Sequence, residues 1–136
     1  MTQPVSDTQA MIGGMNPTLD NRSWCFVSAD EPDLVIELMR SALATFREDE
    51  GLSLIVPHAV AVEHDLAADP FARITLQVHS ALEGVGLTAA VSGALADAKI
   101  PCNMVAALRH DHVFVPAAMS DMAMEVLGNL QAGFST

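Results

Sequence analysis

The order of apolar patterns between residues 71 and 130 is the feature that most restricts what this chain can fold into. Ile74, Leu76 and Val78 alternate with polar residues, which is the pattern of a strand with one buried face. Apolar residues then recur first at helical spacing, next in two short strand-like runs, and again at helical spacing. The predicted order is strand, helix, strand, strand, helix, over 74–79, 87–98, 100–107, 112–115 and 120–130.

This order supplies five of the six elements of a split βαβ, ferredoxin-like unit. Residues 131–136 are too few and too polar to form the sixth element, which is a strand. We therefore expect the first half of the chain to supply it, so that the two halves share sheets or pack as a tandem pair. The predicted fold class is α+β and ferredoxin-like, with antiparallel sheets in two lobes.

The first half shows a similar but less regular pattern. Trp24–Ser28 is an aromatic and β-branched run that predicts a strand, and Glu31-Pro32 is suited to the start of a helix from Asp33. That helix either continues towards Gly51 or ends early, in which case 45–47 and 52–56 form a hairpin around this glycine. A short helix is predicted over 59–66.

Three segments follow from these patterns. Residues 1–15 are mostly polar and contain Gly13-Gly14, so we expect a mobile N-terminal arm outside the core. Residues 16–70 are the predicted first lobe, and residues 71–136 the second.

Composition excludes several classes of partner. The 136 residues contain 6 basic and 17 acidic side chains, a net charge of -11, which repels nucleic acids and anionic membranes. The chain begins without the basic start and apolar run of a signal peptide and has no membrane-spanning run, so we expect a cytoplasmic protein. Cys25 and Cys102 lie in apolar, strand-like contexts typical of buried free thiols.

A family resemblance adds to these patterns. The stretch from Ile74 to Pro116 contains HSALEGVGLTAAVSGALADAKIPCNMVAALRHDHVFVP, which resembles an ACT domain. More closely, this string, together with MNPTLDNRSWCFVSA and FREDEGLSLIVP, resembles a family of small bacterial tandem ACT proteins of unassigned function, with one insertion near 32–41. The ACT modules of aspartate kinases and of cytosolic arginine sensors are distantly similar.

The resemblance implies a regulatory protein that binds an amino acid or a similar small zwitterion and forms a homodimer. In the distant relatives, the ligand touches the loop after the first strand of an ACT unit and the second strand. Carried over to this sequence, the implied ligand-binding residues are Ser80, Leu82, Glu83, Gly84, Val85, Gly86, Leu87, Cys102, Asn103 and Met104.

The residues themselves leave alternatives open. Gly84 and Gly86 precede a helix whose unpaired N–H groups can hold a carboxylate, with Glu83 beside them for an ammonium group, but the glycines can equally serve a tight turn. His110-Asp111-His112 offers metal-ligand chemistry, although a polar hairpin tip needs no metal. We expect no catalytic, metal or cofactor site. The alternative functions are a ligand-free dimerisation module or a histidine-based metal-binding protein.

Overall fold

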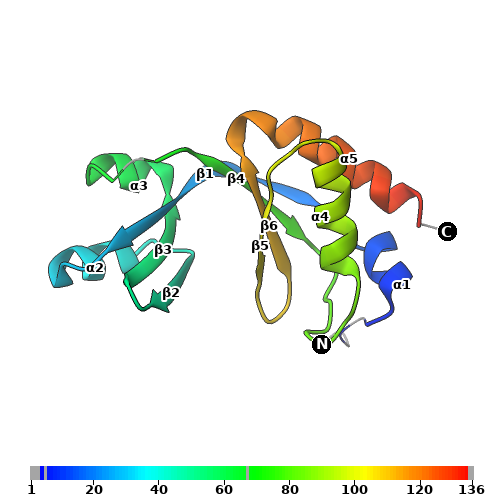
Figure 1. Cartoon of the computed structure of the whole chain (residues 1–136), viewed down its shortest axis with the longest axis horizontal. Coiled ribbons are helices and arrows are strands. Elements are labelled where there is room, and N and C mark those ends of the chain that lie inside the picture. Colours follow the sequence, from blue (N-terminus) through cyan, green and yellow to red (C-terminus); the bar gives the residue numbers. More distant parts are fainter. Residues whose placement is uncertain (1–3, 5, 67, 135–136) are drawn as a thin grey trace. The chain divides into compact units, whose positions relative to one another are not determined.

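A computed structural model describes residues 4, 6–66 and 68–134 of the chain, and these residues form two compact units (Figure 1). We call Asn21–Phe71 the middle unit, and Met1–Asp20 together with Ala72–Thr136 the terminal unit. The long strand β1 (Thr18–Ala29) begins in the terminal unit and continues in the middle unit. The units therefore differ from the predicted lobes, because residues up to Asp20 belong with the second half of the chain.

The terminal unit has the predicted ferredoxin-like arrangement. Its strands lie in the order β1-β4-β6-β5, and β5 and β6 pair antiparallel. The strand missing from the second half is supplied by the first residues of β1, which confirms that expectation. The elements after β1 are β4 (Phe71–Leu76), α4 (Leu87–Asp97), β5 (Asn103–Ala106), β6 (Asp111–Pro116), a 3-10 turn (Ala117–Met119) and α5 (Ser120–Ala132).

The middle unit repeats the same order on a smaller scale. After β1 come α2 (Pro32–Met39), β2 (Ala44–Glu48), β3 (Gly51–Pro57) and α3 (His58–Glu63), with strands in the antiparallel order β2-β3-β1. Phe71, the first residue of β4, packs edge-on against Phe26 of β1, with ring centroids 5.3 Å apart. Because strands and helices follow one another in the same order in both units, the two units support a duplication of topology.

Local chemistry explains where α2 begins and ends. The Glu31 carboxylate accepts hydrogen bonds from the backbone N–H groups of Asp33 and Leu34, and Pro32 occupies the first turn. The helix ends at Met39, so the hairpin reading of residues 45–56 is correct. Gly51 takes φ 143° at this turn, a conformation that favours glycine.

The core of the terminal unit lies between its sheet and three helices. In β4 the buried residues alternate as predicted, and Ile74 and Leu76 are fully buried, whereas in β6 the successive residues Val113, Phe114 and Val115 are all buried. The helices α4 and α5 cover this face together with the short helix α1 (Thr8–Gly13) (Figure 1). The buried members of this cluster are Met11, Ile12, Met15, Ala72, Ile74, Leu76, Val78, Leu87, Val91, Leu95, Ile100, Val113, Val115, Ala123 and Leu127.

The expected mobile arm needs correction. Residues 1–3 and 5 lie outside the described part of the chain, but Thr8–Gly13 forms a helix capped by the Asp7 carboxylate, which accepts from the Ala10 N–H at 2.8 Å. Met11, Ile12 and Met15 are at most 2% exposed. The prediction failed because the helix has only six residues, and its two adjacent buried residues, Met11 and Ile12, carry too weak a periodic signal to be recognised without the surface that they cover.

The middle unit has its own smaller core. Its buried residues are Cys25, Ala29, Leu38, Leu54, Val56 and Ala61. Cys25 and Cys102 are both free thiols, as expected, and the Cys25 thiol donates to the Ala68 carbonyl at 3.3 Å. Among the described residues, no helix is both long and apolar enough to cross a membrane.

Candidate functional site

The glycine-containing loop of the terminal unit borders a small hollow of about 140 Å³. The loop connects β4 to α4, and the opposite wall comes from the β5–β6 hairpin. At about 30 Å³ for each water-sized group, the hollow holds roughly five such groups. Its lining residues are Met11, Ser80, Ala81, Leu82, Gly84, Gly86, Leu87, Thr88, Ala106 and Asp111.

Gly86 sets the direction in which α4 leaves the loop. This residue is the N-cap of the helix with φ 102°, and no side chain caps the helix there. The first N–H groups of a helix lack partners within the helix and carry its partial positive charge. The hollow therefore has an uncapped helix N-terminus at one end.

The helix α1 covers the same loop. The Thr8 hydroxyl donates to the Val85 carbonyl. A Cβ added at Gly84 would lie 3.0 Å from the Met11 sulfur, and one added at Gly86 would lie 2.7 Å from the Thr8 methyl carbon. The two glycines are therefore needed for the close packing of α1, whether or not a ligand binds beside them.

The other end of the hollow is acidic. The Ser80 hydroxyl donates to a carboxylate oxygen of Asp111 at 3.1 Å, and both residues line the hollow. Asp111 pairs with Ala106 at the start of β6, and this register brings its side chain to the loop. Sequence reasoning considered Asp111 only within the histidine cluster, since its distance from Ser80 depends on how β4 and β6 lie in the sheet.

The structure brings together only part of the implied ligand site. Ser80, Leu82, Gly84, Gly86 and Leu87 line the hollow, whereas Glu83 and Val85 are exposed and do not.

The strand residues of the implied site lie elsewhere. Cys102 and Met104 pack against the core, and burial raises the pKa of the Cys102 thiol. Asn103 is exposed and, by strand alternation, lies on the opposite face. The three strand residues therefore do not line the hollow beside the loop.

Within the histidine cluster, the His112 side chain contacts the neighbouring strand β4. His112 is half-buried, and its Nδ1 lies 3.0 Å from the Thr75 hydroxyl oxygen. Burial lowers the pKa of His112, and the positive charges of Arg73 and His110 lower it further, while Asp111 acts in the opposite direction. In the described ranges, no three His, Cys, Asp or Glu side chains gather closely enough to hold a metal ion.

The lowered pKa of His112 predicts a pH dependence of stability. Below pH about 6.5 the unfolded chain binds a proton at this residue more readily than the folded chain, so stability falls as the pH drops through that value towards the lower folded pKa. His112→Gln should make the free energy of unfolding depend less steeply on pH in this range. Denaturant unfolding of both proteins between about pH 5 and 8 tests it; an unchanged slope in the variant would contradict the assignment.

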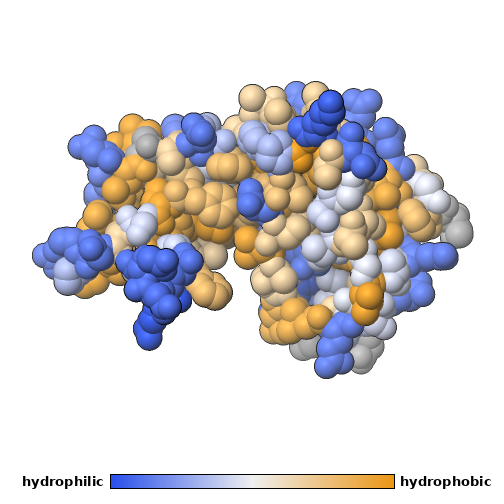
Figure 2. All heavy atoms as spheres, in the orientation of Figure 1, coloured by the Kyte–Doolittle hydropathy of each residue, from blue (hydrophilic) through white to orange (hydrophobic). Residues whose placement is uncertain are grey.

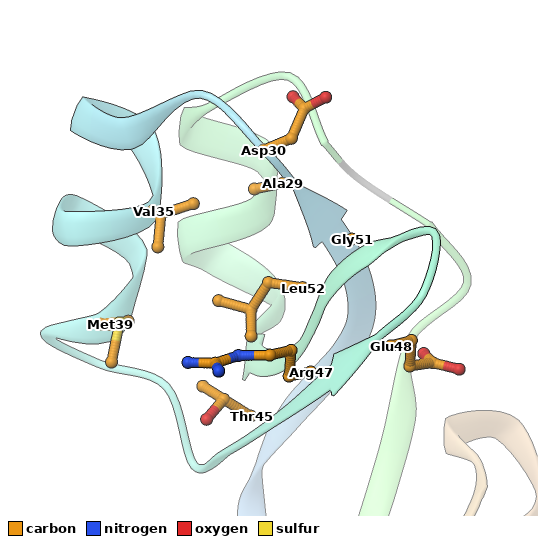
Figure 3. Close-up of a pocket in the computed structure, with 9 residues that line it drawn as sticks. All are labelled: Ala29, Asp30, Val35, Met39, Thr45, Arg47, Glu48, Gly51 and Leu52. Atoms are coloured by element: carbon orange, nitrogen blue, oxygen red, sulfur yellow. The ribbon is translucent and has the colours of Figure 1, made fainter.

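A second and larger hollow lies within the middle unit (Figure 3). It measures about 680 Å³ and opens between α2 and the β2–β3 hairpin. Figure 2 shows apolar surface over this unit, bordered by hydrophilic residues at the hairpin. The lining residues are Ala29, Asp30, Val35, Met39, Thr45, Arg47, Glu48, Gly51 and Leu52.

The comparisons with known proteins agree with this fold. Two family models, each described as an ACT domain, match residues 3–73 and 72–129. The chain therefore belongs to the ACT domain family, with two such domains in tandem. ACT domains are regulatory modules, and neither matching model is a catalytic family. No curated protein is significantly similar to the chain.

The solved structures that resemble this chain include a relative that is similar in sequence and others that are similar in fold. A Vibrio cholerae protein of unknown function, described as a possible transport protein, is 35% identical with a TM-score of 0.77, covering 88% of this chain and 92% of that one. An Agrobacterium tumefaciens protein is 18% identical with a TM-score of 0.64, covering 85% and 87%. The regulatory subunit of aspartate kinase from Thermus flavus is 11% identical with a TM-score of 0.59, covering 84% and 95%.

Proposed function

We propose that this chain is a cytoplasmic regulatory protein that binds a small amino acid or similar zwitterion in the hollow beside the glycine loop. The proposal rests on two opposite charges at the two ends of this hollow. An uncapped helix N-terminus lies at one end and the Asp111 carboxylate at the other. A ligand with one carboxylate and one ammonium group matches this pair.

The volume of the hollow narrows the ligand class. Space for roughly five water-sized groups suits glycine, alanine or serine and excludes aromatic or long basic side chains unless α1 moves. Met11 of α1 forms part of the wall. Asp111 takes the role of ammonium partner that the sequence suggested for Glu83, because Glu83 does not line the hollow.

Assembly as a homodimer is part of the same proposal. The strands β2 and β5 end the strand orders of their units, so each presents a free edge among the described residues. Exposed sheet edges tend to pair with another chain unless they are protected. Ligand occupancy beside β5–β6 would then influence assembly through the edge formed by β5.

Asp111→Asn should weaken binding of the preferred small amino acid roughly tenfold, because the amide retains the shape of the side chain but loses the charge that pairs with the ammonium group. Glu83→Gln is the matched control, since it removes one negative charge from the same loop region outside the hollow. Thermal shift against the proteinogenic amino acids identifies the ligand, and calorimetry measures its affinity for each variant.

Two results would contradict the proposal. If no amino acid raises the unfolding temperature of the parent protein, the chain is better described as a ligand-free dimerisation module. If both variants bind equally well, the ligand lies elsewhere.

A further inference from the structure

The hollow of the middle unit presents an isolated cation beside an apolar wall. In Figure 3 the guanidinium of Arg47 extends from β2 under Leu52 towards α2, with the Thr45 side chain next to it. Val35 and Met39 project from α2 on the facing side. Arginine fits a carboxylate through two parallel hydrogen bonds, and aliphatic side chains favour a compact apolar body.

Arg47 has no acidic partner in the described part of the chain, a property that it shares with Arg109 but not with Arg73 or Arg40. The guanidinium of Arg73 contacts Asp20 at 2.9 Å, and that of Arg40 contacts Glu37 at 3.5 Å. Arg22 lies over the Trp24 ring, 4.7 Å from its centroid. In a chain of net charge -11, an unpaired arginine facing an apolar hollow is a local site for an anion.

The acidic residues at the rim do not turn into the hollow. Figure 3 shows the carboxylates of Asp30 and Glu48 directed away from its centre. Glu48 instead accepts a hydrogen bond from the Ser53 hydroxyl. An ammonium group inside the hollow would therefore meet Arg47 without an inward carboxylate to balance it, so the site favours an anion over a zwitterion.

We propose that the middle unit binds a small monocarboxylate with a short branched aliphatic body, its carboxylate on Arg47 and its body against Val35, Met39 and Leu52. At about 680 Å³ the hollow falls within the range of roughly 300–1,000 Å³ of small-molecule sites. The unbranched, flexible Met39 is 53% exposed and can close over such a body. This site lies beyond the proposed function, since it shares no residue with the glycine-loop hollow.

The test uses the full chain with isotope-labelled methyl groups, titrated with isovalerate and followed by NMR. Isovalerate should shift the methyl signals of Val35, Met39 and Leu52, and Arg47→Gln should weaken its binding roughly tenfold. Arg40→Gln is the matched control, because it removes an exposed positive charge from the end of α2 outside the hollow. It should retain the affinity of the parent protein.

Further ligands and variants make the outcome decisive. Isovaleramide, which lacks the charge, and valine, which adds an ammonium group to the same carbon skeleton, should both bind more weakly than isovalerate. Met39→Glu should weaken isovalerate by placing a like charge at the mouth, which gives a second test if Arg47→Gln perturbs the fold. Asp111→Asn should leave isovalerate binding unchanged, so failure of the proposed function and failure of this site are distinguishable.

Three results would overturn the proposal: isovalerate binding that Arg47→Gln does not weaken, equal weakening by Arg40→Gln, or isovaleramide binding as tightly as isovalerate. The absence of methyl shifts at millimolar isovalerate would overturn it as well.

Discussion

Ile12→Ala is expected to lower the free energy of unfolding by about 2–5 kcal/mol, the cost of removing a large aliphatic side chain from a packed core. Ile12 is 2% exposed and belongs to the core of the terminal unit. Its substitution leaves a cavity where the surrounding side chains relax only in part. Denaturant unfolding at constant pH measures the change.

Ile36→Ala in α2 is the matched control for this first prediction. Ile36 is 62% exposed, so the same change should alter stability by no more than about 0.5 kcal/mol. Equal effects of the two substitutions would show that α1 does not pack as described. The N-terminal segment would then behave as the detached arm that its polar composition suggests.

Gly86→Ala is expected to destabilise the protein by about 1–3 kcal/mol. The residue has φ 102°, where side chains other than glycine are strained, and the added Cβ would lie 2.7 Å from the Thr8 methyl carbon. Gly93→Ala in the same helix should instead stabilise by about 0.5–1 kcal/mol, because nothing lies within 4 Å and alanine is the better helix former. Thermal unfolding of the two variants shows whether each substitution lowers or raises the stability of the protein.

A double variant separates the two causes of the Gly86 effect. Thr8→Ser removes the methyl group and keeps the hydroxyl that donates to the Val85 carbonyl. Thr8→Ser with Gly86→Ala should therefore recover part of the stability lost in Gly86→Ala, leaving the backbone strain. If the serine variant recovers nothing, α1 does not lie against the loop at this point.

Substitutions at Gly84 and Gly86 cannot by themselves test ligand binding beside the loop. A valine at Gly84 or Gly86 would crowd the backbone where a ligand is expected to approach it. The structure shows that it would crowd Met11 or Thr8 as well, so a loss of binding in such variants would not distinguish ligand contact from displaced α1. Asp111→Asn avoids this ambiguity because it changes charge and leaves the volume almost unchanged.

The sequence determined the fold class because its signals are local. The alternation of Ile74, Leu76 and Val78 and the helical spacing of Leu87, Val91 and Leu95 each depend on neighbours within a few residues. The conclusion that a sixth strand had to come from the first half followed from element count alone. The resemblance of the glycine-loop string to ACT domains agreed with the family match.

The tertiary structure decided which distant residues meet, because pairing between strands and helix packing join positions far apart in the chain. Asp111 reaches Ser80 only through the placement of β6 beside β4, and α1 is buried by distant parts of the chain, which include α4, α5 and the glycine loop. The larger hollow had no sequence signal, since Arg47 and Met39 face it from different elements. The sequence by itself thus determined the elements and their order, whereas the surfaces of both hollows depend on long-range contacts that no local pattern encodes.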